Sequence, residues 1–191
     1  MPKIEITPTV GLVQKAGSGD VAFGLKSTAL SGAGLLSTEI APSVRVSQIN
    51  DEVVTTIKID LTGLSYVNTD TTVIGLAAGA AYMFQYSVAT HGILSRAEIH
   101  CIETPTAASN AVLDFDIESS ASGTLIKAGS PATPIVVSGA NSAKGSVIID
   151  NVLGVPTDGH YLYLCVGAAP GGADTSTAGK LIIKLFGHLT F

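Results

Sequence analysis

Three carboxylates stand at alternate positions of one short segment. Asp114, Asp116 and Glu118 are separated by Phe115 and Ile117, which is the period-two pattern of a β-strand. Such side chains project from one face of a strand at intervals of about 7 Å. They could bind a divalent cation such as Ca²⁺ if loop oxygens completed its coordination shell. More often such a row is the solvent-facing side of a half-buried strand, so we expect no metal and keep this row as the single candidate cation site.

Other residue types used in catalysis form no recognisable motif. The histidines are His91, His100, His160 and His188. None has the spacing of a metal-binding pair, and no G-x-S-x-G, H-E-x-x-H or C-x-x-C sequence occurs. His100 shares the polar side of its segment with Arg96 and Glu98, while His91 and His160 adjoin glycines at turns, so surface roles are expected. The sequence therefore predicts no catalytic residue, no cofactor and no enzyme.

The composition favours a protein whose surface is covered by partners. Charged residues make up 13% of the chain, against a typical value of about 25%, and protein interfaces are depleted in Lys, Glu and Asp. An ordinary Ser/Thr-rich β protein would have the same composition. The net charge is −5 and the basic residues are spread thinly, so no patch for nucleic acid or an anionic membrane is expected. Trp is absent and aromatic residues make up 5%, which argues against a stacking platform.

The cysteines and the apolar segments bear on the cellular compartment. Cys101 and Cys165 each lie in an apolar, strand-like run, and we expect buried free thiols rather than a disulfide. The segment after Met1 lacks the layout of a signal peptide. The apolar stretch over 73–84 contains glycines and is too short to span a bilayer. These features predict synthesis and use in a cytoplasm, or an exit that does not use the secretory route.

The chain divides into two parts of different composition. Residues 1–42 are rich in Gly, Ala and Ser and predict an extended N-terminal arm, which another subunit or a capsid would hold in place. Residues 43–191 contain nearly all the alternating apolar positions and predict a β-sandwich domain. The alternation is clearest where Val53, Ile57 and Ile59 face one way, after an Asn-Asp turn that predicts a hairpin.

Further strands are expected throughout the C-terminal part. The candidate segments are 81–87, 93–102, 111–118, 124–127, 146–150, 161–166 and 181–186. About ten short strands with turn residues between them predict an all-β, jelly-roll-like antiparallel β-sandwich. Residues 73–81 could form one helical turn. Loops are expected over 127–144, with one edge strand near 135–137, and over 167–177.

A succession of short strand signatures carries a family resemblance. The signatures are Ile57-Lys58-Ile59-Asp60-Leu61-Thr62-Gly63-Leu64, Val73-Ile74-Gly75, Ala81-Tyr82-Met83-Phe84-Gln85, Thr90-His91-Gly92-Ile93, Cys101-Ile102-Glu103-Thr104-Pro105, Asp114-Phe115-Asp116-Ile117, Tyr161-Leu162-Tyr163-Leu164 and Thr177-Ala178-Gly179-Lys180-Leu181. This succession resembles a family of virion structural proteins of marine tailed phages and cyanophages, usually described as hypothetical or as capsid decoration (cement) proteins. The resemblance covers about residues 57–186 and includes no functional-site motif.

The resemblance implies a role, a location and partners. It implies a jelly-roll-like domain on the outside of a phage head that staples adjacent major capsid proteins together, commonly as an oligomer. The expected partners are the major capsid protein and further copies of this chain, with a trimer favoured. The expected location is the outer capsid surface, after synthesis in the bacterial host cytoplasm.

Three other functions compete with this expectation. A tail-tube or adaptor subunit would also be rich in β-strands with an inserting arm, and ring or hexamer formation would favour it. A fibre or receptor-binding head would need exposed aromatic residues beside carboxylates, of which the sequence supplies few. A β-sandwich glycanase comes last, because no catalytic pair of carboxylates stands out.

Overall fold

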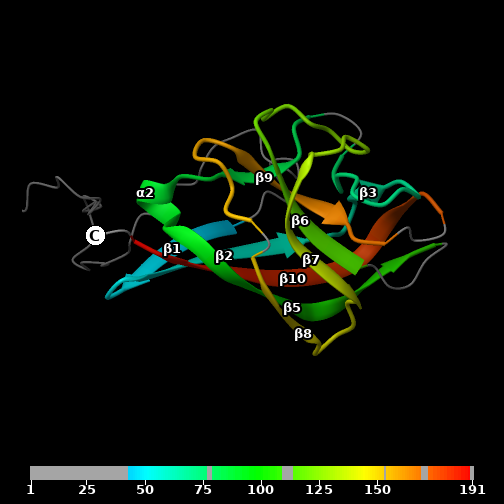
Figure 1. Ribbon diagram of the computed structural model, residues 1–191. Helices are drawn as coiled ribbons and strands as arrows, with labels where there is room; N and C mark the ends of the chain where they lie inside the picture. Colours follow the sequence, from blue (N-terminus) through cyan, green and yellow to red (C-terminus); the bar gives the residue numbers. More distant parts are fainter. Residues whose placement is uncertain (1–42, 77–78, 109–113, 153, 169–171, 190–191) are drawn as a thin grey trace, which may run out of the picture.

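The computed structural model describes residues 43–189, except 77–78, 109–113, 153 and 169–171. The expected arm over residues 1–42 lies outside this described part. The described chain is almost entirely β-structure, arranged as two antiparallel sheets that pack face to face (Figure 1). The predicted all-β sandwich is therefore confirmed.

Each sheet draws its strands from distant parts of the sequence. Sheet I has the order β1 (Ser43–Ile49), β2 (Glu52–Asp60), β10 (Asp174–His188), β5 (Ile93–Ala107) and β8 (Val147–Asn151), and the short β3 (Ser65–Tyr66) also pairs with β10. Sheet II has the order β4 (Tyr82–Gln85), β9 (Tyr161–Val166), β6 (Asp114–Ser120) and β7 (Thr133–Asn141). A short helix, α2 (Val88–His91), joins β4 to β5.

The strand order is that of a jelly roll. Four strands of sheet I, in the order β2-β10-β5-β8, face the four strands β4-β9-β6-β7 of sheet II. From β2 onward the main strands pass from one sheet to the other, except that β6 is followed by β7 within sheet II. Eight strands in two sheets are characteristic of the jelly-roll architecture. Strand β1 extends sheet I by one strand at the β2 edge.

The β1–β2 hairpin forms where the alternating sequence predicts it. Ile49 pairs with Glu52 across the turn at 50–51, and Asn50 adopts a positive φ of 55°, which Asn tolerates better than most residues. Val53, Ile57 and Ile59 of β2 are buried, whereas Lys58 between them is exposed. The hairpin therefore sets which face of sheet I is turned toward the core.

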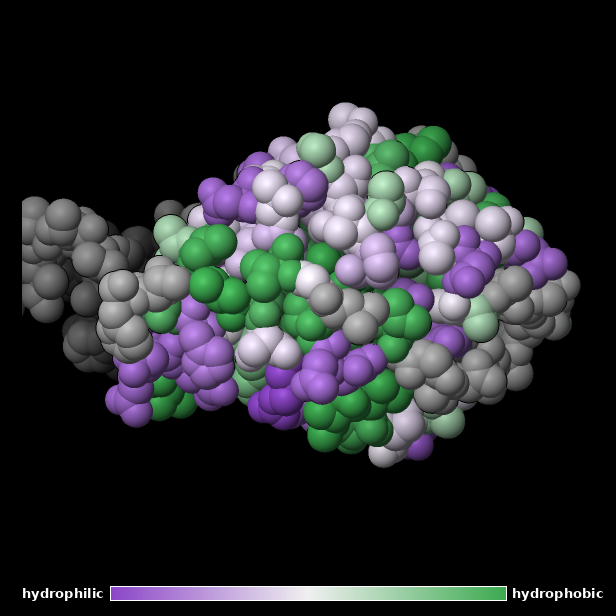
Figure 2. Space-filling model, viewed as in Figure 1, coloured by the Kyte–Doolittle hydropathy of each residue, from purple (hydrophilic) through white to green (hydrophobic). Residues whose placement is uncertain are grey.

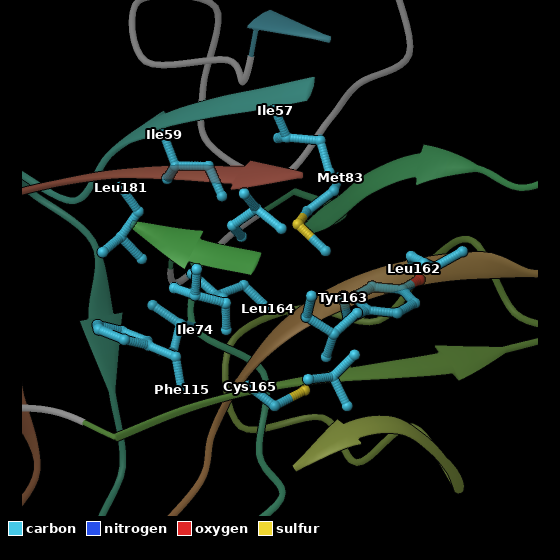
Figure 3. Close-up of a cluster of buried hydrophobic side chains, with 14 of the residues drawn as sticks. Ile57, Ile59, Ile74, Met83, Phe115, Leu162, Tyr163, Leu164, Cys165 and Leu181 are labelled. Carbon is cyan, nitrogen blue, oxygen red and sulfur yellow. The ribbon is translucent and has the colours of Figure 1, made fainter. Parts of the chain in front are cut away.

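The core fills the space between the two sheets (Figure 3). Sheet I contributes aliphatic side chains such as Ile57 and Ile183, and sheet II contributes Phe115, Ile117 and Leu164, all with no exposed surface. Burying one such side chain stabilises the fold by roughly 1.5–3 kcal/mol relative to leaving it in water. Both cysteines are free and buried, as the sequence predicts.

Four local expectations differ from the structure. Residues 73–76 make isolated bridges to Ser65 and Cys165 instead of a helical turn, and the helix lies at Val88–His91. Residues 124–127 belong to a loop, although the sequence suggests a strand. Strand β7 occupies much of the expected loop 127–144, and β10 begins at Asp174 inside the other expected loop. The physical reason is that pairing of a short segment depends on which strands lie next to it in the folded protein, and the local alternation of apolar residues carries no information about those neighbours.

Candidate functional site

The three carboxylates of β6 share one face, as their spacing predicts, but that face is buried. Asp114 is 5% exposed, and Asp116 and Glu118 are each 2% exposed. Phe115 and Ile117 point the other way into the core. The expectation of a solvent-facing row is therefore wrong, because β6 is covered on both sides. We call Asp114, Asp116 and Glu118 the acidic row.

The row lies beside strand β9, whose alternate residues point to the same side. Asp116 pairs with Cys165 and Glu118 pairs with Tyr163. Because side chains alternate along a strand, Cys165 and Tyr163 share the outer face of sheet II with the acids. Both are fully buried.

The segment 121–131 covers this outer face. The Tyr163 hydroxyl donates to the Ser122 carbonyl at 2.6 Å. Further along the segment, Leu125 O accepts from the backbone N–H of Ala81, and Gly129 O accepts from that of Val73. These bonds hold the segment over the sheet without a regular strand. Leu125 of this segment also packs against the core, so an apolar residue is used here although the segment forms no strand.

Gly167 determines how closely the chain can approach the acidic row. A β-carbon at this position would lie 2.7 Å from Asp116 Oδ1 and 2.8 Å from Asp114 Cγ. Real β-carbons do not come so close to other heavy atoms, so a glycine is required unless the carboxyl groups move. In the sequence, this residue appears only as the glycine that ends an apolar strand.

Burial and like charge together raise the pKa of Glu118 to about 7. Burial is the largest cause, followed by the negative charges of Asp116 and of Asp70 in the loop before Val73. Oε1 of Glu118 is buried and has no hydrogen-bond partner among the described residues. The carboxyl group therefore holds its proton in the folded protein up to nearly neutral pH.

The same surroundings act on the neighbouring thiol. Burial raises the pKa of Cys165 well above its usual value, and the charges of Glu118 and Asp116 raise it further. The thiolate is the nucleophilic form of cysteine. Cys165 is thus a packed, protonated side chain and not a nucleophile.

The acidic row does not have the geometry of a metal site. Within the residues that the structure describes, no three His, Cys, Asp or Glu side chains are placed so that they could hold a metal ion. A row along one strand spreads its oxygens along a line, whereas a cation needs them to converge on a point. The candidate cation site at Asp114, Asp116 and Glu118 therefore receives no support from the geometry.

The histidines fall into two kinds of environment. His100 Nε2 donates to Glu98 Oε2 at 2.9 Å on the outer side of β5, and Arg96 donates to the same carboxylate, as the alternation predicts. His91 is buried at 3% exposure, with its ring 4.7 Å from that of Phe84, so the expected surface role is wrong for it. Burial lowers the pKa of His91, and the neutral ring is part of the packing around α2.

Comparison with known proteins gives no relative. No family model, no curated protein and no solved structure matches the chain. In the described part of the chain, no helix has both the length and the apolar character needed to cross a membrane.

Proposed function

We propose that this chain is a non-enzymatic capsid decoration protein, which binds the outside of a tailed-phage head and stabilises contacts between major capsid proteins. The family resemblance of residues 57–186 motivates the identity of the partner. The jelly-roll order of the strands is compatible with it, since jelly rolls are common among viral capsid domains. A similar fold does not by itself establish a function, so the proposal also needs support from the surface of the molecule.

The observation that carries the proposal is the division of polar and apolar groups between inside and outside. The carboxylates that could do chemistry are buried in the acidic row, whereas aliphatic side chains project from the surface. The most exposed large ones are Ile49 at 69%, Ile149 at 61% and Val147 at 50%. Groups arranged in this way suit association with other proteins better than catalysis.

The tyrosines argue against a glycan-binding head. Tyr66, Tyr86 and Tyr163 have no exposed surface, and Tyr82 and Tyr161 are only half-buried and contact each other edge to face, with ring centroids 4.9 Å apart. Sugar-binding sites use open aromatic faces, and all five tyrosines of the chain are used in packing. The fibre function therefore has less support than the decoration function.

Such a protein would act by mass action. A protein that binds the mature shell but not its precursors or fragments adds its binding free energy to the stability of the shell. Repetition over a symmetric lattice allows modest individual contacts to sum. This function requires a rigid domain whose surface binds other proteins, and it does not require a catalytic group.

The test is the copy number of this chain relative to the major capsid protein in purified particles, by quantitative mass spectrometry. A ratio near one copy per capsid subunit, or a simple fraction of it, is expected. Particles that lack the chain should also release their DNA at a lower temperature, and purified protein added back should restore the original value. A handful of copies per particle would indicate a tail or fibre role, and absence from particles would refute the proposal.

A further inference from the structure

Within the described part of the chain, strand β8 has a pairing partner on one of its two sides. It is the last strand of sheet I, and among the described residues it pairs only with β5. In Figure 1 it lies at the lower margin of the molecule, with β5 above it. An open strand edge presents a row of backbone donors and acceptors that another strand can use.

The hydrogen-bond pattern shows which backbone groups point outward. The N–H of Cys101 donates to Ser146 O, and the N–H of Val152 donates to Ser95 O, both in register with the β5–β8 pairing. In an antiparallel pair, hydrogen-bonded positions alternate with non-bonded ones. The even-numbered residues of β8 therefore face β5, while the backbone groups of Val147, Ile149 and Asn151 face away from it.

The same three residues place their side chains on the outer face of sheet I. Val147 is 50% exposed and Ile149 is 61% exposed, and Figure 2 shows a hydrophobic patch at the lower margin, beside hydrophilic residues. Natural edges are commonly protected by Lys, Pro or a bulge, and none of these occurs within β8. The protection within this strand comes from Asp150, a charged residue that pairs with the buried Ala97 and whose Oδ1 accepts the N–H of Asn151 at 2.8 Å.

We propose that two copies of this chain pair along β8 in antiparallel orientation, with Ile149 opposite the partner's Ile149. In this register each Ile149 N–H donates to the partner's Ile149 carbonyl, and each Val147 N–H donates to the partner's Asn151 carbonyl. Four backbone bonds form in this way, two of each kind, without disturbing the bond of Asp150. The two sheets would then continue as one sheet across both copies.

A second copy fits this edge because the strand is complementary to itself. A two-fold axis through Ile149 places the Ile149 side chains of the two copies directly opposite each other, as a cross-strand pair of the kind that stabilises sheets. Asn151 would face the partner's Val147, and Asp150 would face the partner's Ile148. The pairing therefore opposes no like charges. It predicts a dimer where the family resemblance favours a trimer.

The experiment measures the oligomeric state of the full chain by sedimentation velocity from micromolar to submillimolar concentration. The variant Ile149→Lys sets two ammonium groups opposite each other and should weaken dimerisation by more than about tenfold. Ile126→Lys is the matched control, because Ile126 is also an exposed isoleucine, at 44%, but lies on the segment covering sheet II. A second variant, Ile149→Pro, removes the outward N–H while leaving the bonds to β5 in place.

We expect the wild type to be a dimer and both Ile149 variants to be monomers with an unchanged circular dichroism spectrum. The Ile126→Lys variant should remain a dimer. A monomer at every concentration, a trimer, or a dimer that survives both variants would overturn the proposal. The inference adds self-association of the chain to the proposed function, and the two can fail separately. If the chain dimerises but does not bind phage particles, the proposed virion role is refuted. If the chain binds particles as a monomer, the proposed β8 dimer is refuted.

Discussion

Glu98 and Glu118 lie on the outer faces of the two sheets of the same sandwich, and their environments are opposite. Glu98 of sheet I accepts bonds from Arg96 at 2.5 Å and from His100 at 2.9 Å. The bond to His100 is the largest cause that lowers its pKa, with Arg96 and Lys184 adding to it. Glu118 of sheet II is 2% exposed, and burial together with the charges of Asp116 and Asp70 raises its pKa to about 7.

The comparison shows that alternation in the sequence identifies the two faces of a strand, but it does not indicate which other segments cover each face. Both glutamates alternate with buried aliphatic residues, and both strands lie within the same fold. On β5 the polar face meets water and neighbouring cations, so the carboxylate is stabilised. On β6 the face is buried and other carboxylates lie near, so the protonated form of the Glu118 carboxyl group is favoured up to about pH 7. Four tests probe this contrast, and their expected effects on stability decrease from the first to the fourth.

The first test is the substitution Gly167→Ala, which should disrupt the packing against the acidic row on the outer face of sheet II. The added β-carbon would lie 2.7 Å from Asp116 Oδ1, and relieving such overpacking costs about 3 kcal/mol of unfolding free energy. Denaturant unfolding at neutral pH measures it. Gly154→Ala is the control, because a β-carbon there would have nothing within 4 Å of it, and it should change stability by less than about 0.5 kcal/mol. Equal effects of the two changes would mean that the acidic row is loosely packed.

The second is Glu118→Gln, which mimics the protonated carboxyl group. Since folding raises the pKa from 4.5 to about 7, the folded state binds the proton more tightly than the unfolded state. The contribution of Glu118 to stability is therefore full below pH 4.5 and is lost as the pH rises to about 7. Above that pH, the variant should be more stable than the wild type by about 2 kcal/mol.

The measurement is the difference between the two unfolding free energies as a function of pH. A difference is needed because the pKa of His91 is lowered by burial, so its contribution to stability is lost as the pH falls and gives a slope of the opposite sign. A difference that is constant between about pH 4.5 and pH 8 would show that Glu118 is not held in its protonated form.

The third is Glu98→Gln on the open side. The lowered pKa of Glu98 means that its contribution is present above the ordinary pKa of a glutamate and is lost as the pH falls through the lowered value. Because the ion pair with Arg96 and the hydrogen bond from His100 are partly exposed to solvent, the variant should lose less than about 1 kcal/mol at neutral pH. The loss should shrink with added salt, in contrast to the effect at Glu118.

The fourth test is chemical reduction, for which we expect no effect. Cys101 and Cys165 are free and buried, and burial raises the pKa of both thiols. The melting temperature should therefore be the same with and without a reducing agent, and alkylation should require unfolding. Rapid modification of the native protein would mean that the cover over Cys165 opens.

Much of the fold could be predicted from the sequence because strand formation leaves a local pattern. The buried face of β2, the hairpin at 50–51 and the β-sandwich class follow from alternation and turn residues, and the buried free thiols follow from the apolar runs around the cysteines. The ends of strands are harder to predict, as at β10, which begins at Asp174. Strand ends depend on the length of the neighbouring strand, which lies far away in the sequence.

Alternation within residues 114–118 is sufficient to predict a strand with Phe115 and Ile117 on one face and the acidic row on the other. The three-dimensional packing determines that the acidic face is buried, that Gly167 lies against it and that the charge of Asp70 acts on Glu118. It also determines that β8, among the described residues, pairs on one side alone. The physical reason is that a strand's period is a property of its own backbone, whereas burial and charge pairing depend on which distant segments pack against it.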